Sequence, residues 1–533
     1  MRLHSATEPQ FRPAIEGFSY ADLHDPIRLE ALHERFLADV RKADADLGRA
    51  WDSYRAPNAP AISRIAESDL LVRMAPHVSR FLARTFAIER EAEALAAEAR
   101  HEEPLFRFKV EFVRRRALLL LKAHGGHVAV AAADRERIQQ IFAQAHNGDR
   151  ELALAKHGCL LLDRERAFAD DARTGEAWDG LQAEMDVVAR WCAAHVHDHA
   201  YKSWVVFRFP ENVDPFHLVP VVRPRADLPE ALNGPDERLR RRDGFKLTDE
   251  RMTRREVESE ISYCLLCHSR EKDSCSTGLR DKTGAVQTNP LGIPLAGCPL
   301  DEKISEMHTL EKQGDAIGAL ALVMIDNPMC PGTGHRICND CMKSCIYQKQ
   351  EPVNIPQIET GVLTDVLKLP WGVEIYGLLS RWNPLNRKRP YALPYNGKNV
   401  LVVGLGPAGY TLAHYLLNEG FGVVGMDGLK IEPLPERITG ENGSVPEPVR
   451  EWRSLYAPLD ERVLEGFGGV SEYGITVRWD KNFLSLVHLT LARRSLLKIY
   501  GGIRFGGTVT IDDAWNWGRW RHSVCPSAGH QPQ

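Results

Sequence analysis

Apolar residues recur at three- and four-residue steps over most of the first 200 positions, which is the spacing of one face of an α-helix. Proline and glycine gather between the periodic stretches rather than inside them. This pattern predicts a mostly α-helical region over residues 1–200, and no residue pattern in it indicates catalysis. The predicted helical stretches are Asp25–Tyr54, Ala61–Ala99 and Leu105–His124.

The pattern changes after residue 200. Residues Trp204–Phe209 alternate between large apolar and other side chains, which predicts a short strand. Prolines then recur, and a basic run, Arg238–Arg242, reads either as a partner contact or as a solvated linker. We therefore predict a connecting region over residues 201–255, a helical domain over 256–380 and a proline-rich linker over 381–397.

A nucleotide-binding pattern follows the linker. The apolar run Asn399–Val403 predicts a buried strand that leads directly into the glycine-rich turn of residues 404–409. A helical stretch and a second strand ending at Asp427 come next, so the glycines occur in a strand–turn–helix–strand context. A turn of purely structural purpose is the alternative.

Each position of this turn has a physical reason. Gly404 permits the tight turn, Gly406 lets the backbone approach a pyrophosphate, and Gly409 lets helix and strand pack closely. Phosphates favour the amides at the helix N-terminus. Asp427, about 20 residues further on, is placed to accept from a ribose hydroxyl. Residues 398–518 are therefore predicted to form an incomplete Rossmann-like domain of α/β class.

Composition narrows the class of protein. The 533 residues include 72 acidic and 68 basic side chains, and the net charge of −4 gives no general attraction to nucleic acid. The longest apolar runs fall short of the roughly 20 residues of a membrane span. The N-terminus lacks the apolar stretch of a signal peptide, so we expect a cytoplasmic protein.

Cysteine is the most unevenly placed residue. Eleven cysteines occur, and eight of them lie between residues 264 and 345 at short, uneven gaps. Gathered thiolates suit zinc or iron–sulfur centres, whereas disulfides are disfavoured without secretion. Structural zinc and unrelated buried thiols are the alternatives. The eight are Cys264, Cys267, Cys275, Cys298, Cys330, Cys338, Cys341 and Cys345.

Two smaller features stay open. Cys192, His195, His197 and His199 could hold a metal, but spacings of two place alternate histidines on different helix faces, which favours a polar helix end. The run Arg114–Arg116 reads as a docking patch or as a solvated helix face.

The order of motifs resembles a known family. Paired cysteine runs, then Val353–Glu359, then the glycine-rich turn resemble the small-subunit family of glutamate synthase and the related N-terminal half of dihydropyrimidine dehydrogenase. The resemblance covers about residues 255–515. It implies a helical domain with two 4Fe–4S clusters ahead of an FAD domain into which an NADPH domain is inserted.

The resemblance also implies roles for single residues. It implies a first cluster set of Cys264, Cys267, Cys275 and Cys345, and a second set of Cys298, Cys338 and Cys341 with Glu359 as a further ligand. Cys330 would be a neighbour or an alternative ligand. The implied FAD contacts are Gly404, Gly406, Pro407, Ala408, Gly409, Asp427, Gly469, Gly474 and Ile475.

Two departures limit the resemblance. The gaps around Cys275 are longer than usual, and residues 519–533, including Cys525, show neither a strand nor a helix pattern. The second glycine fingerprint, for NADPH, is missing, so we expect a truncated, frameshifted or split chain.

The expected function is an FAD-dependent oxidoreductase that passes electrons between NAD(P)H, FAD and a partner site through two 4Fe–4S clusters, with a redox partner protein or subunit and a homo- or hetero-oligomer. The alternative is a non-catalytic iron–sulfur carrier or docking subunit, or an inactive fragment of such an oxidoreductase.

Overall fold

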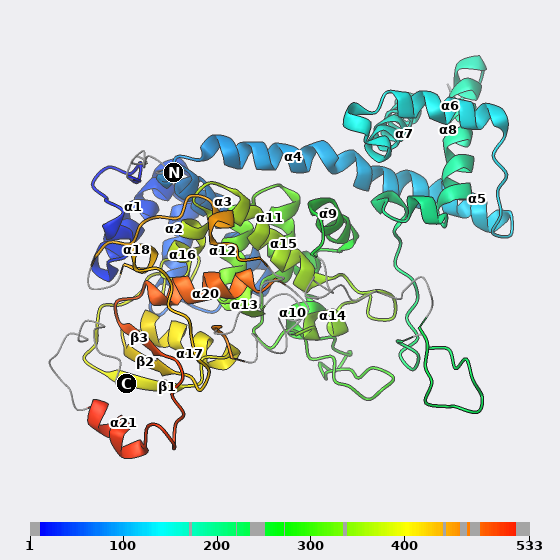
Figure 1. Cartoon of the computed structure of the whole chain (residues 1–533). Coiled ribbons are helices and arrows are strands. Elements are labelled where there is room, and N and C mark those ends of the chain that lie inside the picture. Colours follow the sequence, from blue (N-terminus) through cyan, green and yellow to red (C-terminus); the bar gives the residue numbers. More distant parts are fainter. Residues whose placement is uncertain are drawn as a thin grey trace, which may run out of the picture.

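The chain is described by a computed structural model that covers residues 11–169, 173–219, 221–234, 251–270, 272–333, 338–440, 444–458, 466–469 and 480–518. These residues are mostly helical and include one small parallel sheet (Figure 1). Residues Arg238–Arg242, Gly474, Ile475 and the tail from residue 519, all singled out in the sequence, lie outside the described residues.

The first helices lie at residues 21–108. They are η1 (Ala21–Leu23), α1 (Pro26–Ala43), α2 (Ala45–Arg55), α3 (Arg64–Thr85) and α4 (Glu89–Phe108). The next group comprises the π-helix η2 (Lys109–Ala117), α5 (Leu118–Ala123), α6 (Ala132–Ala143), η3 (His146–Gly148), α7 (Arg150–Ala167), α8 (Glu176–His195), η5 (His199–Tyr201) and η6 (Val205–Phe207).

The cysteine-rich region is helical, as the sequence predicts. Its elements are α9 (Arg254–Tyr263), η8 (Cys267–Arg270), α10 (Ser274–Thr277), α11 (Ile304–Lys312), α12 (Ala316–Asp326), α13 (Cys330–Thr333), α14 (Asp340–Ser344), α15 (Ile355–Lys368) and α16 (Gly372–Leu379). The last group is β1 (Asn399–Val403), α17 (Pro407–Asn418), β2 (Gly422–Met426), α18 (Glu436–Thr439), η10 (Trp452–Leu455), α20 (Asn482–Ala492), β3 (Leu497–Tyr500) and α21 (Ile511–Gly518).

The N-terminal stretches predicted as helical are confirmed as helical. Two of them are interrupted at residues where the spacing of apolar residues shows no interruption. Asp44 ends α1 and starts α2, since its carboxylate accepts from the Leu47 N–H at 2.9 Å. A second break follows α3, where Ala87 has φ +51°. A polar cap and a left-handed residue therefore divide these predicted stretches into separate helices.

The strand predicted over residues 204–209 is wrong. Residues Val205–Phe207 form the 3-10 helix η6, and the Val206 N–H donates to Glu151 at 2.9 Å instead of to a neighbouring strand. Trp204 and Phe207 stack with ring centroids 5.7 Å apart, which a tight turn allows because it places residues three apart on one side.

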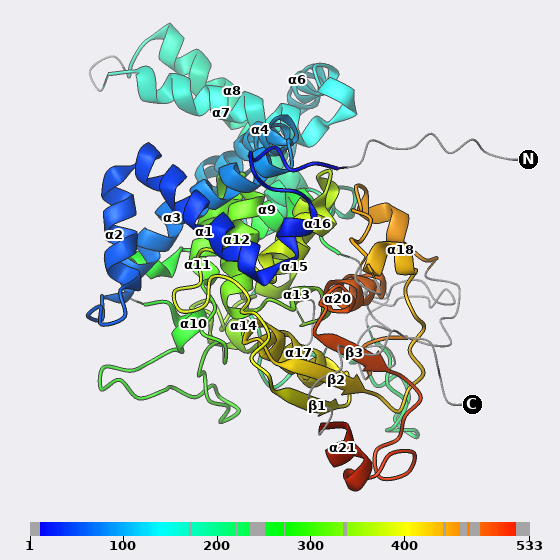
Figure 2. The same ribbon diagram turned by 90° about the vertical axis from the view of Figure 1, so that its left-hand side faces the viewer.

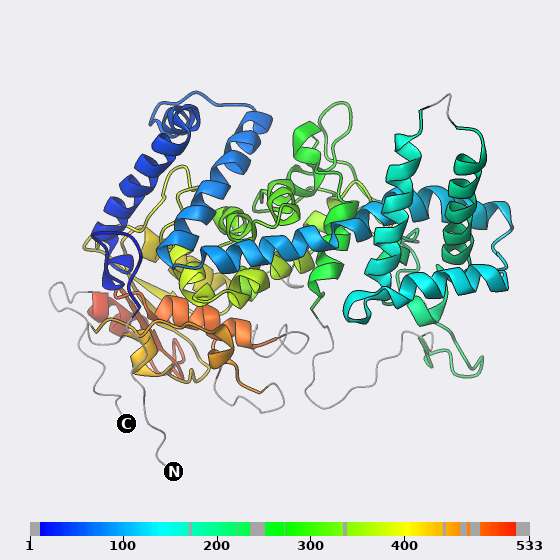
Figure 3. The ribbon, with the colours of Figure 1, turned by 90° about the horizontal axis from the view of Figure 1, so that it is seen from above.

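Two hydrophobic cores divide the N-terminal half of the chain. Buried residues between Ile15 and Leu95 share one core with the cysteine-rich helices, which we call the central body. Buried residues between Leu105 and Phe207 form a second core, which we call the helical arm. Helix α4 runs from the central body into the helical arm, as the view from above shows (Figure 3).

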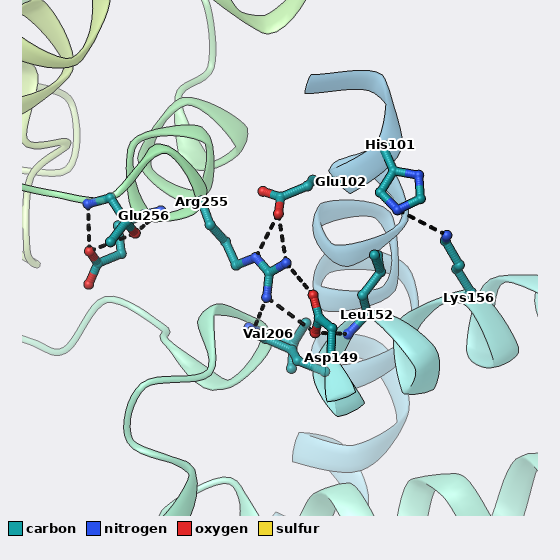
Figure 4. Close-up of polar contacts among 10 residues, drawn as sticks. His101, Glu102, Asp149, Leu152, Lys156, Val206, Arg255 and Glu256 are labelled. Carbon is teal, nitrogen blue, oxygen red and sulfur yellow. Dashed lines mark hydrogen bonds and ion pairs between the residues drawn. The ribbon is translucent and has the colours of Figure 1, made fainter. Parts of the chain in front are cut away.

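An ionic cluster fastens the helical arm to the central body. Arg255 on α9 donates at 2.6 Å both to Glu102 of α4 and to Asp149, which caps α7 (Figure 4). Its third partner, Glu151, also accepts from the backbone of Val206. One guanidinium thus joins two arm helices to the helix that leads into the first cysteine.

The sheet is small and parallel, with strand order β1-β2-β3. The register pairs Asn399 with Gly422 and Val423 with Leu497. Helix α17 connects β1 to β2 and packs on the sheet, while α21 lies beyond β1 (Figure 2). We call β1, α17, β2 and β3 the sheet unit. The strand, turn, helix and strand predicted from residue 399 onward are confirmed at the level of backbone structure.

The segment predicted as a linker, residues 381–397, begins in the protein interior. Trp382 is fully buried, and the Asn383 side chain donates to the Ala321 carbonyl at 2.8 Å. This segment therefore holds the sheet unit against the central body. Across the part of the chain that the structure describes, no helix is long and apolar enough to cross a membrane.

Candidate functional site

Four of the predicted cysteines line one small pocket in the central body. Cys264 follows α9, Cys267 starts η8, Cys275 lies in α10 and Cys345 follows α14. The remaining wall is largely apolar and includes Val353 and Ile355. These four are the residues that the family resemblance implies for the first cluster, and the fold brings them together although Cys345 is distant in the sequence.

Local backbone features shape this pocket. Leu266 has φ +50°, and its N–H points at the Cys264 sulfur at 3.4 Å. On the far side, a Cβ at Gly297 would lie 2.4 Å from the Gly278 nitrogen, so two chain segments touch there through glycine. The Gly297 N–H donates to Ser344 on α14 at 2.9 Å, which joins this turn to the helix before Cys345.

Burial controls the protonation of the thiols in this pocket. Burial raises the pKa of all four thiols, that of Cys264 to about 12. Thiolates are the form that binds metal, so a cationic centre is needed to keep these sulfurs deprotonated. The described cysteines are all free thiols, and none of them pairs with another as a disulfide.

His308 on α11 lines the same pocket without any hydrogen bond. The imidazole is fully buried, and neither ring nitrogen has a partner. Burial, with a smaller contribution from His268, lowers the pKa of His308 to about 3, so the ring is neutral and carries one N–H donor. The other ring nitrogen is an acceptor, so His308 brings one unpaired donor and one unpaired acceptor to the pocket wall.

The second predicted set lies near two carboxyls, those of buried Glu359 and half-buried Glu302. Cys298 and Cys341 lie close enough to Glu302 and Glu359 for those acids to raise the pKa of both thiols, after the larger effect of burial. Cys338 neighbours Cys341 and is exposed. Glu302 is an addition that sequence reasoning missed, although it follows Cys298 by only four positions.

Glu359 is held by an amide. Asn327 donates to its Oε1 at 2.6 Å, and Asn327 also bonds to Glu302. Burial and Glu302 raise the pKa of Glu359 well above its usual range. The residue that the resemblance implies as a non-cysteine ligand therefore lies beside the second cysteine set, fully enclosed.

Cys330 belongs with the second set rather than with the first. The thiol is buried at the start of α13, and burial, Glu359 and Glu302 raise its pKa. Helix α13 also contacts the sheet unit, since a Cβ at Gly332 would lie 2.4 Å from the Tyr410 hydroxyl oxygen. One short helix thus separates the second cysteine set from the glycine-rich turn.

The two cysteine sets adjoin each other. The Cys298 N–H donates to the Cys275 carbonyl at 2.8 Å, which joins one member of each set through the backbone. Helix α14 carries Cys341 of the second set and ends at Cys345 of the first, one helical turn further on.

Among the described residues, no three His, Cys, Asp or Glu side chains converge as a single metal ion would require.

The glycine-rich turn has the backbone that its sequence requires. Gly404 has φ +89°, and its N–H donates to the Met426 carbonyl at 2.7 Å. A Cβ at Gly409 would lie 1.8 Å from the Gly404 carbonyl oxygen, so α17 can approach the strand only with glycine there. Gly406 caps α17, whose first turn contains Pro407 and Ala408.

Two further predicted residues meet this turn. The Asp427 carboxylate accepts from the Leu405 N–H at 2.7 Å and from the Leu429 N–H at 2.9 Å, so it braces the turn. A Cβ at Gly469 would lie 3.0 Å from Gly406 Cα and 3.8 Å from Asp427 Oδ2. Gly474 and Ile475 lie outside the described residues, and their predicted flavin contacts stay predictions.

Cys192 and the histidines at the end of α8 do not converge as metal ligands would among the described residues. Cys192 is fully buried, and the His195 Nδ1 contacts the Trp191 carbonyl at 2.8 Å while its ring stacks on that indole. His197 and His199 are exposed. The polar helix end is therefore the interpretation that the structure supports.

Comparison with known proteins gives partial matches. The profile of a family described as the RP005 N-terminal alpha-helical domain matches residues 15–87, which contain α1–α3. The uncharacterized protein RP006 of Rickettsia prowazekii is 49% identical over 201 residues, which are 38% of this chain and 28% of that protein. The uncharacterized protein RP005 of the same organism is 26% identical over 303 residues, 54% of this chain and 94% of that protein.

One match carries a biochemical name. The glutamate synthase (NADPH) small chain of Mycobacterium tuberculosis is 29% identical over 186 residues, which are 34% of each protein. The chain thus spans about a third of the length of that protein and under a third of RP006. The predicted resemblance to the glutamate synthase small-subunit family is supported as a distant likeness over part of the chain.

Proposed function

We propose that the chain is an iron–sulfur flavoprotein oxidoreductase subunit. In this proposal the first and second cysteine sets each hold a 4Fe–4S cluster, and the glycine-rich turn holds FAD. When bound, FAD would exchange hydride with NAD(P)H and the clusters would carry single electrons to a redox partner protein or subunit, in the cytoplasm. The observation that carries the proposal is the pocket lined by Cys264, Cys267, Cys275 and Cys345.

The chain's own residues have defined tasks in this proposal. Apolar side chains such as Val353 and Ile355 exclude water from the first pocket, and the backbone N–H of Leu266 is positioned to donate to sulfur. Such hydrogen bonds and dry surroundings set the potential of a cluster. At the second set, Asn327 orients Glu359 toward one conformation.

The arrangement of the sites supports an ordered path. The glycine-rich turn adjoins α13, α13 starts at Cys330 of the second set, and the second set shares α14 with the first. In this proposal the electrons pass from the flavin to the second set and then to the first set.

Anaerobic purification of the full chain tests the proposal, with iron, acid-labile sulfide, zinc and flavin assayed on one sample. Two clusters require about eight irons and about eight sulfides per chain. Zinc without sulfide would contradict the cluster proposal. Clusters without flavin would instead favour the second candidate, a non-catalytic iron–sulfur carrier.

Variants separate the two cysteine sets. Cys345→Ala and Cys341→Ala should each lower the iron content to about four per chain, because each removes one ligand from one cluster. Cys192→Ala, which changes a buried thiol of the helical arm, is the matched control and should leave the iron content unchanged. Equal iron in all three variants would show that the cysteines do not bind it.

A further inference from the structure

A large cavity lies where the helical arm meets the central body. Its volume is about 690 Å³, and its walls come from the start of η2, from the residues after α8, and from α9. The Arg255 cluster of Figure 4 fastens the arm to α9, and Ser259, one turn further along α9, lines the cavity. The cavity is thus built by two cores that are held in fixed positions.

Lys109 is the buried charge of this cavity. The residue is 6% exposed, and its ammonium donates to the Ser259 hydroxyl at 2.8 Å. No carboxylate of the described residues lies within ion-pair distance of it. An ammonium has three N–H donors, so this site keeps a cation with donor capacity to spare, which is costly unless a ligand uses it. Lys109 is also the first residue of a π-helix, a feature frequent at functional sites.

The acids facing Lys109 do not form an ion pair with it. Glu260 has the largest opposing charge and raises the pKa of Lys109, but its carboxylate is beyond ion-pair distance and accepts from the Asn354 N–H at 2.9 Å. Glu151 is engaged by Arg255, and Arg208 adds repulsion. The remaining acids of the cavity stand exposed at its rim, where water screens them. Those rim acids are Asp198, Glu211 and Glu351.

Aromatic rings supply much of the remaining wall. Trp204 and Phe207 stack nearly parallel, with an interplanar angle of 18°. Phe209 lies with its ring centroid 5.6 Å from the Lys109 ammonium. Tyr201 and Tyr263 complete this wall. Flat, rigid side chains favour a flat ligand, since ring faces stack with little loss of conformational entropy.

We propose that this cavity binds a planar organic anion, with a carboxylate on the Lys109 ammonium and an aromatic ring against the wall formed by Trp204, Phe207 and Phe209. The site goes beyond the proposed cluster and flavin sites and does not depend on them. Its position is notable for one reason: Tyr263 stacks on Tyr347 with ring centroids 4.1 Å apart, and Tyr347 lines the first cysteine pocket. A ligand here would lie one tyrosine pair away from that pocket.

Titration of the full chain with 4-fluorobenzoate, followed by fluorine NMR, tests the proposal. A ligand of this size should bind with a Kd on the order of 1 mM. On the unmodified chain, 4-fluorobenzylamine, which reverses the charge and keeps the ring, should bind at least about tenfold more weakly. Equal binding of the acid and the amine, or no binding of the acid at about 20 mM, would overturn the proposal.

Two lysine variants locate the site. Lys109→Met should weaken 4-fluorobenzoate at least about tenfold, whereas Lys122→Met, at an exposed position of the same arm, should leave it unchanged. A thermal melt of each variant checks that the arm remains folded. Unchanged binding in folded Lys109→Met would overturn the proposal, and the acid–amine comparison decides it independently if that variant does not fold.

Discussion

Glu374 on α16 lies where three distant parts of the chain meet, and its removal should destabilise the whole central body. Its carboxylate accepts from the Tyr20 hydroxyl at 2.6 Å, from the Arg493 guanidinium at 2.8 Å and from the Val449 N–H at 2.6 Å. The side chains of Arg493 and Glu374 are only 2% and 1% exposed. One buried carboxylate on α16 therefore joins the start of η1, the segment before η10 and the end of α20.

The cost of Glu374→Ala follows from what it leaves behind. Removing one partner of a buried ion pair costs about 3–5 kcal/mol, because the other charge stays buried without compensation. Two further buried donors, the Tyr20 hydroxyl and the Val449 N–H, lose their acceptor, at about 1–3 kcal/mol each, although such effects are not additive. We expect the free energy of unfolding to fall by about 4–6 kcal/mol.

Equilibrium unfolding in urea, followed by far-UV circular dichroism, measures this loss. Glu447→Ala is the matched control, since Glu447 also pairs with an arginine, Arg437, at 3.0 Å but is 61% exposed. An exposed pair contributes about 0–1 kcal/mol. A loss in Glu374→Ala no larger than that in the control would refute the reasoning.

A double variant isolates the stranded charge. Glu374→Leu combined with Arg493→Met replaces the pair by apolar side chains of similar size, and such replacements are often neutral or stabilising. We expect the double variant to regain most of the stability that Glu374→Ala loses. If it is no more stable than Glu374→Ala, the uncompensated guanidinium is not the cause of the loss.

Three further outcomes test other sites. His308→Phe should keep the iron content but lower the midpoint potential of one cluster by about 40 mV, measured by redox titration followed by EPR. The reason is the loss of a hydrogen-bond donor that stabilises the reduced cluster by about 1 kcal/mol. An unchanged potential would show that His308 does not donate to a cluster. Gly409→Val should abolish flavin binding while iron is retained, since its side chain would meet the Gly404 carbonyl; flavin at wild-type stoichiometry would argue against FAD on this turn. Burial lowers the pKa of Lys109 from its usual 10.5 to about 8, which corresponds to about 3 kcal/mol of instability at neutral pH that Lys109→Met should relieve. Between pH 8 and 10.5 the unfolded chain binds more protons than the folded one, so the unmodified chain gains stability as the pH rises. The stability advantage of Lys109→Met in urea melts should therefore shrink over this pH range. A stability advantage independent of pH would contradict this account.

Features encoded in short stretches were predictable from the sequence. The glycine-rich turn is one, because the positions of Gly404 and Gly409 fix the backbone locally and nothing distant is needed to explain it. The alternation at residues 204–209 led to a wrong prediction, because a strand and an aromatic 3-10 turn share it. Contacts with distant residues, Glu151 and Trp191, distinguish the two.

Features that depend on tertiary packing were not predictable. A single lysine or histidine in a helical pattern reads as an exposed position, and the sequence does not show that Lys109 and His308 face cavities. The cysteine spacing indicates a zinc or iron–sulfur centre, but the spacing alone does not show that Cys345 belongs to the same set as Cys264. The family resemblance supplied that partition, and the pocket agrees with it in placement.

The shared core of the central body has a consequence for dissecting this protein. Helix α3 packs on α12, so residues 64–85 cover apolar surface that belongs to the cysteine-rich region. A fragment that begins at α9 would expose the face of α12 that α3 covers, and it should self-associate unless residues 11–95 are supplied in trans. The start of α9, where the cysteine motifs begin, is therefore not a domain boundary at which the chain can be divided. The two fragments should form a monodisperse complex only when they are refolded together.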